Sequence, residues 1–326
     1  MIGLFSQIEI NFILFLQSLG HWLMPVMQFF TFLGSEYTYM FILPLIYWCI
    51  DATIGVRTGV MLVMSNTTNG LIKLAFHSPR PYWVDARVQA FSAETSFGFP
   101  SGHSFNAAAI WGVVIKSFKK PWLTMVGLLT IFMIGLSRLY LGVHFVSDVL
   151  GGWLLGGLFL LLVSYLEKPV VRWIKARSFS FQIFFFFAVS LVLILLGFLF
   201  TKVSPSFVVP QSWINQALAS SNEAPDPYSL EGFYTVAGVF FGFTSGYAWL
   251  CKKFGLVVVK GTFGKRAIRL LLGLVGVGLI YFGLKLILPV DPPWLGVILR
   301  YIRYALVGWW VAAGAPIVFK LLHLDE

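Results

Sequence analysis

The chain has 326 residues, of which 58% are hydrophobic and 11% are charged, and it carries a formal net charge of +10. Soluble domains carry about 25% charged residues, so this composition excludes an ordinary soluble protein and indicates an integral membrane protein. The positive charge fits membrane topology and attraction to anionic lipid. No aromatic-basic module that would indicate nucleic-acid binding accompanies it.

Apolar runs long enough to cross a hydrocarbon core recur along the whole chain. They predict an all-α, polytopic membrane protein with about ten transmembrane helices, whereas a closed barrel would require short alternating strands that the sequence lacks. No cleavable signal peptide precedes the first run. In chain order, the expected spans are residues 11–33, 37–50, 54–76, 103–118, 122–141, 145–166, 181–200, 233–251, 268–288 and 304–321.

Basic residues concentrate in alternate connections between these spans, around Arg57 and within 116–120, 168–177 and 252–266. Short loops rich in Lys and Arg stay in the cytoplasm, so the opposite span ends should be extracytoplasmic, in a bacterial-type cytoplasmic (inner) membrane. The longest polar stretch, residues 204–231, is then an extracytoplasmic loop with one short amphipathic helix. It acts either as a lid or as a plain connector.

The sequence divides into two regions near a basic segment at residues 167–179. Residues 1–170 hold all the clusters described below, and residues 171–326 form an additional four-helix transmembrane region. Its glycine-rich segments favour close helix packing, which would widen a lipid pocket, support a homodimer or cover the first region. Cys49 and Cys251 lie near expected cytoplasmic span ends, where a structural disulfide is not expected, and no Cys/His spacing resembles a zinc site.

The first polar cluster consists of Lys73 and Arg80-Pro81. Lys73 lies inside an expected span, and Arg80 lies beyond its end, where the following proline favours an extended backbone. Both cations would then converge on one anion at the membrane interface, with arginine suited to bidentate contact with phosphate oxygens. The alternative is snorkelling, in which each cation separately reaches lipid headgroups.

The second cluster, Pro100-Ser101-Gly102-His103, lies where a loop is expected to turn into a helix. Free backbone N–H groups at a helix start bind anions, and Gly102 allows a ligand to approach the backbone closely. Ser101 adds a hydroxyl donor, and His103 is positioned to protonate a leaving oxygen. The same triplet on its own is also typical of an ordinary turn.

The third cluster consists of Ser137-Arg138, His144 and Asp148. The spacing of four predicts that His144 and Asp148 share a helical face, with the carboxylate accepting a hydrogen bond from the imidazole Nδ1–H. This leaves Nε2 with a lone pair, so His144 is a candidate nucleophile toward phosphorus, with Asp148 stabilising the cation that develops. The alternative is a buried structural pair that holds two helices together.

These three clusters resemble the complete signature of the type-2 phosphatidic acid phosphatase superfamily, in the same order and with the same internal spacings. The resemblance covers about residues 1–170 and implies a six-helix membrane core with its site at the outer membrane face. By position, it makes His144 the nucleophile that forms a phosphohistidine and Asp148 the residue that orients it. It makes His103 the proton donor and then the base that activates water.

The resemblance also assigns the phosphoryl oxygens to a set of cations and small residues, namely Lys73, Arg80, Ser101, Gly102 and Arg138. It implies no metal and no cofactor. The expected substrate is a lipid phosphate, for which phosphatidic acid, phosphatidylglycerophosphate, an isoprenyl pyrophosphate and a sphingoid phosphate are all candidates. Residues 34–51 are loosely similar to the sphingosine-phosphate phosphatase branch. Two other functions stay open: a lipid phosphotransferase, and a transporter or scramblase that keeps the headgroup site.

Overall fold

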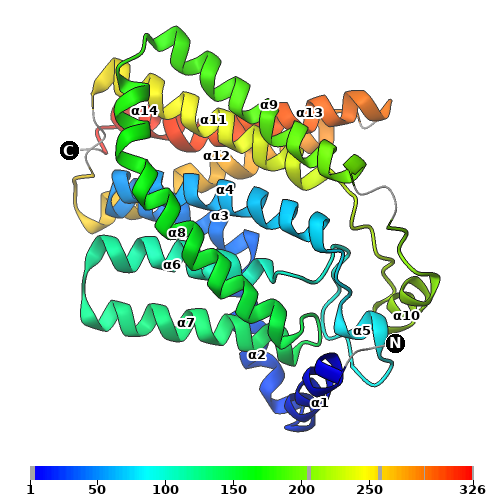
Figure 1. The fold of residues 1–326 in the computed structure, drawn as a ribbon. Coiled ribbons are helices and arrows are strands. Elements are labelled where there is room, and N and C mark those ends of the chain that lie inside the picture. The colour runs from blue at the N-terminus through cyan, green and yellow to red at the C-terminus, as the bar shows by residue number, and fades with distance from the viewer. Residues whose placement is uncertain (1–3, 204–206, 256–258, 290, 325–326) are drawn as a thin grey trace. The chain divides into compact units, whose positions relative to one another are not determined.

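The computed structural model describes residues 4–203, 207–255, 259–289 and 291–324 (Figure 1). The chain is 80% helical, and no strand occurs in these ranges, so the all-α prediction is confirmed. The longer helices are α1 (Leu4–Ser18), α2 (Met24–Leu33), α3 (Glu36–Leu45), α4 (Ala52–Phe76), α6 (Gly102–Phe118), α7 (Pro121–Tyr140), α8 (Val146–Lys175), α9 (Phe179–Val203), α10 (Gln211–Ser221), α11 (Glu231–Phe254), α12 (Phe263–Ile287) and α13 (Pro293–Trp309). Short helical elements are η1 (His21–Leu23), η2 (Ile46–Ile50), α5 (Pro81–Val84), η3 (Trp310–Gly314) and α14 (Ala315–Leu321).

Five helical stretches within the described ranges are long and apolar enough to cross a membrane. They are Pro121–Tyr140, Val146–Lys175, Phe179–Lys202, Phe263–Ile287 and Pro293–Leu321, and a bent pair at Ser6–Leu33 raises the number to six. The expected count of about ten spans is therefore not confirmed, although a helix lies at each predicted position. The reasons are local: α6 has 17 residues, α3 has 10, and α4 contains the polar run 65–69.

Two predicted spans are broken for identifiable reasons. The first bends by 85° between α1 and η1, where Gly20 adopts a φ of +104° that other residues avoid. The second contains Pro44 inside α3 and continues as the π-turn η2, since proline cannot donate the helical hydrogen bond. In contrast, the short helix predicted within residues 204–231 is present as α10.

The chain folds as two compact units that are discontinuous in sequence. The first comprises Met1–Tyr39, Thr68–Leu162 and Phe198–Ser229, and the second comprises Met40–Thr67, Val163–Gly197 and Leu230–Glu326. All residues of the three polar clusters belong to the first unit. These two units are defined by contacts between residues. The sequence-based division into domains at residues 1–170 and 171–326 is a separate claim, and it stays a prediction.

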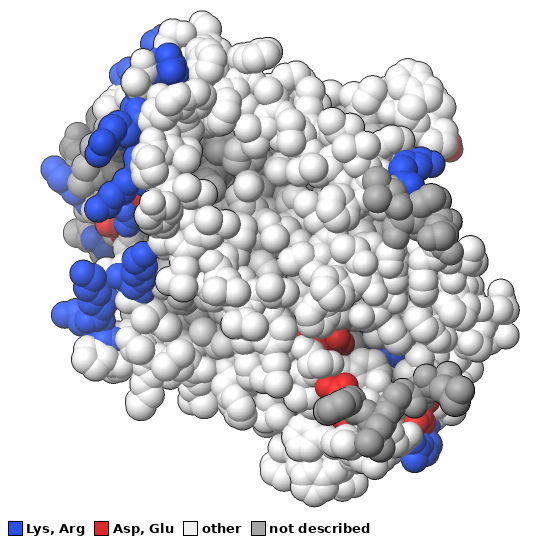
Figure 2. Space-filling model, viewed as in Figure 1, with Lys and Arg blue, Asp and Glu red and all other residues white. Residues whose placement is uncertain are grey.

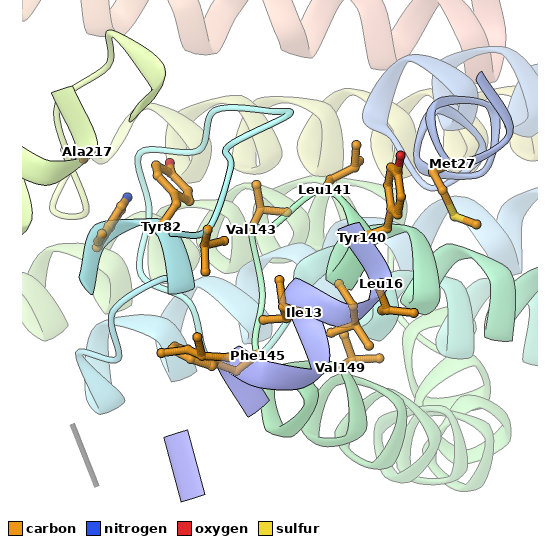
Figure 3. Close-up of a cluster of buried hydrophobic side chains, with 14 of the residues drawn as sticks. Ile13, Leu16, Met27, Tyr82, Tyr140, Leu141, Val143, Phe145, Val149 and Ala217 are labelled. Atoms are coloured by element: carbon orange, nitrogen blue, oxygen red, sulfur yellow. The ribbon is translucent and has the colours of Figure 1, made fainter. Parts of the chain in front are cut away.

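The first unit is built around buried side chains from α1, α5, α7, α8 and α10 (Figure 3). Ile13 of α1, Tyr82 of α5, Tyr140 of α7, Val149 of α8 and Ala217 of α10 are all at most 1% exposed. The residues between α5 and α6 and between α7 and α8 supply further members of this core, so these connections are packed segments rather than free loops.

In the first unit, basic residues lie at the end of α6 that is far from the polar clusters. The turn between α6 and α7 carries Lys119 and Lys120, at the end of α6 opposite Ser101, and its blue side chains are visible in Figure 2. A helix of 17 residues separates these two ends by about 25 Å. In the second unit, Lys and Arg gather where α8 ends and α9 begins (Figure 2).

Candidate active site

Arg80 lies on the segment between α4 and α5, with the extended backbone predicted for a residue before proline (φ −99°, ψ 155°). Its guanidinium is 1% exposed. Nε donates to the Ser96 carbonyl at 2.7 Å, and Nη1 donates to the Val143 carbonyl at 2.9 Å. Nη1 also lies 3.2 Å from Nε2 of His144, so the first and third clusters meet here.

Lys73, on the last turn of α4, is 9% exposed and turned toward the loop that precedes α6. Its Nζ donates to the carbonyl oxygens of Phe97 and Gly98. The Phe97 carbonyl also accepts a hydrogen bond from Arg80 Nη2, at 3.2 Å. The two cations therefore converge on one loop inside the protein, and neither reaches outward as snorkelling would require. Their convergence on an anion stays a prediction.

Ser101 and Gly102 form the start of α6, which confirms the predicted loop-to-helix turn. Ser101 is the N-cap, and its Oγ accepts hydrogen bonds from the N–H and the Oγ of Ser104 at 3.4 and 3.1 Å. A Cβ added at Gly102 would lie 3.2 Å from Oδ1 of Asn69, whose Nδ2 donates to the Pro100 carbonyl. This polar residue of α4, which the sequence analysis did not single out, supports the loop that carries the second cluster.

His103 lies in the first turn of α6, against the chain that follows α2. A Cβ added at Gly34 would come within 3.0 Å of His103 Cδ2 and 2.8 Å of Ile134 Cγ2. The close packing therefore requires a glycine at position 34. His103 therefore packs against Gly34, the C-cap of α2, and Ile134 of α7 lies beside the same glycine.

His144 and Asp148 form the predicted pair, but by a different local geometry. His144 lies in the turn before α8 rather than on the helix, and its Nδ1 is 3.2 Å from Asp148 Oδ2. The same carboxylate oxygen accepts a hydrogen bond from the Phe145 N–H at 2.9 Å, which caps the helix start. Both residues are 2% exposed, and Nε2 of His144 faces Arg80.

Arg138, near the end of α7, is 2% exposed. Its Nη1 donates to Thr31 Oγ1 at 2.5 Å, and its Nη2 donates to Glu94. Its Nε is buried and finds no hydrogen-bond acceptor among the described residues. An unpaired buried donor costs free energy, so this N–H is suited to an oxygen atom of a ligand.

Glu94, which is not among the residues of the three sequence clusters, pairs with one cation of the first cluster and one of the third. It pairs with Arg138 Nη2, and its Oε2 lies 3.7 Å from Arg80 Nη2. Burial raises the pKa of Glu94, but Arg138, Arg80, His103 and Lys73 together lower it to about 2. Glu94 could have been singled out from the sequence, because it is the one carboxylate between Arg87 and His103.

A cavity of about 560 Å³ adjoins Asp148 on the outside of this arrangement. Its walls come from α1, α5, α10 and the start of α8, and they include Glu9, Trp83, Trp213 and Gln216. Glu9 Oε1 accepts a hydrogen bond from the Ser147 N–H at 2.6 Å, at the N-terminus of α8. No Lys or Arg of the described part of the chain lines this cavity, so the cations of the three clusters lie outside its walls. In the same ranges, His, Cys, Asp and Glu side chains form no cluster of three suited to a metal ion.

Comparison with known proteins places these residues in a family. The PAP2 superfamily profile matches residues 54–172, which contain every residue of the three clusters. The profile described as PAP2 superfamily phosphatase, transmembrane extension, matches residues 234–326.

Individual relatives carry different names. Phosphatidylglycerophosphatase B of Bacillus subtilis (strain 168) is 33% identical over 46% of this chain and 78% of its own length. Sphingosine-1-phosphate phosphatase 2 of Homo sapiens is 30% identical over 41% of this chain and 35% of its own length. Undecaprenyl-diphosphatase of Sulfolobus acidocaldarius is 27% identical over 38% of this chain and 62% of its own length. The chain thus spans less than two thirds of the second and third of these relatives.

Proposed function

Because the chain belongs to the PAP2 superfamily of membrane phosphatases, we propose that it hydrolyses a lipid phosphate through a phosphohistidine on His144. One observation carries this proposal. The imidazole of His144 lies between Asp148 at Nδ1 and Arg80 at Nε2, both at 3.2 Å, so a neutral ring presents its lone pair beside a guanidinium. A nucleophile, its orienting carboxylate and a cation for the phosphoryl oxygens are therefore adjacent.

In the first step, Nε2 of His144 attacks phosphorus, a P–N bond forms, and the bond from phosphorus to the leaving oxygen breaks. Asp148 stabilises the positive charge that develops on the imidazole. Protonated His103 gives its proton to the leaving oxygen, which departs as an alcohol or as a lipid monophosphate. The guanidiniums of Arg80 and Arg138 stabilise charge on the equatorial oxygens.

In the second step, neutral His103 takes a proton from water while that water attacks phosphorus. The P–N bond breaks, its electron pair returns to Nε2, and inorganic phosphate leaves. Ser101, Gly102 and Lys73 assist by contact with the phosphoryl oxygens from the start of α6 and the end of α4. No other group is consumed, because the proton that His103 takes from water restores its first protonation state.

Occupation of the site by phosphate requires Glu94 to give up contacts. Its carboxylate pairs with both guanidiniums, which is the same pairing that phosphate oxygens make. The unpaired Nε of Arg138 provides a first contact for the incoming oxyanion. Substrate binding is thus an exchange of one anion for another.

The substrate class follows from the setting. An integral membrane protein with a buried phosphate site favours a lipid whose tail stays in the bilayer, and the relatives act on phosphatidylglycerophosphate, sphingosine 1-phosphate and undecaprenyl diphosphate by name. The distribution of Lys and Arg supports a site on the extracytoplasmic face, which is part of the proposal. We also propose that the protein forms a homodimer and lies in the inner membrane of a bacterium.

The deciding experiment incubates purified protein in detergent with phosphatidic acid, phosphatidylglycerophosphate, an isoprenyl pyrophosphate and a sphingoid phosphate, and measures phosphate release. We expect release from at least one of them and none from His144→Ala. Release that survives in His144→Ala would exclude the mechanism.

The same panel separates the alternative functions. Transfer of labelled phosphate to a lipid acceptor would indicate a phosphotransferase. Absence of release, together with headgroup-dependent lipid movement between leaflets, would indicate transport. Trapping of phosphohistidine in His103→Gln is a further check, because the second step should stall without its base.

A further inference from the structure

The segment that joins α9 to α11 belongs to the first unit, which also contains the three polar clusters. Residues 207–229, which we name the strap, contain α10 and pack against α5 (Figure 1). Ala217 of α10 is fully buried in the same core as Tyr82 and Trp83. The strap is thus fixed to the residues next to Arg80 rather than lying free over the surface.

Both ends of the strap pack aromatic rings against Phe97, in the loop between α5 and α6. Phe207 and Tyr228 lie with ring centroids 5.9 and 5.7 Å from Phe97, and Phe207 stacks on His77 at 4.8 Å. The Tyr228 hydroxyl donates to the Phe207 carbonyl at 2.7 Å, which ties the two ends of the strap together. Phe97 is fully buried by these contacts, and its carbonyl accepts hydrogen bonds from Lys73 and Arg80.

A second contact runs through α10. Trp213 lies 6.3 Å from Trp83 between ring centroids, and the Arg80 guanidinium lies over the Trp83 ring at 5.9 Å. Trp83 is 1% exposed, so it cannot move without displacing either the strap or Arg80.

A third contact holds the loop backbone. The Asp226 N–H donates to the Thr95 carbonyl at 3.0 Å, between Glu94 and Ser96. Glu94 pairs with the two guanidiniums, and Ser96 accepts from Arg80 through its carbonyl and its Oγ. The loop has no regular secondary structure of its own, so its conformation depends on such contacts.

We propose that the strap is a positioning element of the active site, and that Trp213 and Phe207 hold Arg80 in register with His144 through Trp83 and Phe97. The inference rests on the proposed function, because it assigns Arg80 to the phosphoryl oxygens. It gives the segment before the transmembrane extension a role in catalysis that none of the three sequence clusters predicts. A displacement of Arg80 by about 1 Å is enough to lower activity 10- to 100-fold.

The experiment compares Trp213→Ala and Phe207→Ala with wild type, using orthovanadate and the lipid phosphates as separate probes. Vanadate takes the five-coordinate geometry of phosphoryl transfer and has no lipid tail, so its binding, followed by thermal shift, reports the oxyanion site alone. We expect both variants to bind vanadate about tenfold more weakly and to lose about tenfold in kcat, with little change in KM. Trp213→Phe and Phe207→Leu should recover most of both, and Leu218→Ala, on the exposed face of α10, should behave as wild type.

The choice of two positions separates positioning from lipid binding. Trp213 lines the 560 Å³ cavity and Phe207 does not. A rise in KM for lipid in Trp213→Ala alone, with vanadate binding unchanged, would overturn the proposal and assign α10 to lipid binding. Wild-type vanadate binding in both alanine variants would reduce the strap to a connector.

Two further results distinguish failure of the strap proposal from failure of the phosphatase proposal. Wild-type protein that binds vanadate but releases no phosphate from any lipid would overturn the phosphatase and leave the strap comparison intact. Wild-type protein that binds no vanadate would overturn the strap proposal, because there would be no oxyanion site to hold.

Discussion

Glu94 pairs with the two guanidiniums that the mechanism assigns to the phosphoryl oxygens, and it lies in the connection between α5 and α6, outside the helices that cross the membrane. Its pKa is held at about 2, below the ordinary value of 4.5, because the cations outweigh the effect of burial. A pKa that is lower in the folded protein stabilises the fold above the unfolded value, and this stabilisation is lost as the pH falls from about 4.5 through about 2. The difference amounts to at most about 3 kcal/mol of unfolding free energy.

Glu94→Gln should remove this pH dependence. Thermal unfolding in detergent at pH 5 and at pH 3 is expected to show a large drop for wild type and a much smaller one for the variant. Glu223→Gln, an exposed carboxylate of the strap, is the control and should follow wild type. Equal drops in wild type and Glu94→Gln would show that the acid sensitivity arises elsewhere.

A substitution at Asp148 tests its proposed role in stabilising the positive charge on the His144 imidazole. Asp148→Asn keeps the size of the side chain and its acceptor for the Phe145 N–H, but removes the charge that stabilises the imidazolium. By analogy with other oriented histidines, kcat should fall by about 10²- to 10⁴-fold with little change in KM. A KM effect without loss of kcat in steady-state phosphate release would instead place Asp148 in substrate binding.

At the scale of elements, α6 and α8 approach each other through two glycines of α8. Helix α6 carries His103, whereas α8 carries Asp148 and begins two residues after His144. A Cβ at Gly152 would lie 2.7 Å from the Ser101 carbonyl, and one at Gly156 would lie 2.4 Å from the Phe105 carbonyl. Small residues at a spacing of four allow such backbone contact between membrane helices. The distance between the proton donor and the nucleophile therefore depends on this contact.

Gly156→Ala should push the two helices apart. Overpacking of this kind costs about 1 to 3 kcal/mol, so the unfolding temperature should fall and phosphate release should drop at least tenfold. The matched control is Gly157→Ala, one residue further along α8, where an added Cβ meets no atom within 4 Å. Similar behaviour of the two variants in unfolding and activity assays would contradict the contact.

At the scale of the whole molecule, the charge pattern predicts which face carries the site. With Cys49 and Cys251 replaced by alanine, a single cysteine at Glu223 in the strap should react with an impermeant thiol reagent added to intact cells. A cysteine at Lys119, in the turn between α6 and α7, should react only after the membrane is opened. Both positions are exposed and both belong to the first unit, so the reverse labelling pattern would invert the topology.

Several features of this protein follow from the sequence because they depend on residues close together in the chain. Hydrophobic composition determines the membrane class, apolar run length determines where helices form, and the proline after Arg80 determines its extended backbone. The spacing of four between His144 and Asp148 also brings the two side chains together. Even there the local geometry differs from the prediction, because His144 precedes α8 and the Asp148 carboxylate caps the start of the helix.

Only the tertiary structure decided the remaining features, because each depends on contacts between segments far apart in the chain. Glu94 reaches Arg138 across 44 residues, Arg80 reaches His144 across 64, and Trp213 reaches Trp83 from a segment outside the signature. No local pattern encodes such pairings, since hydrophobicity and turn propensity specify where an element forms but not which distant residue it meets. The three clusters could thus be identified from the sequence, whereas the carboxylate that pairs with both Arg80 and Arg138, and the strap that holds Arg80, could be found only in the folded chain.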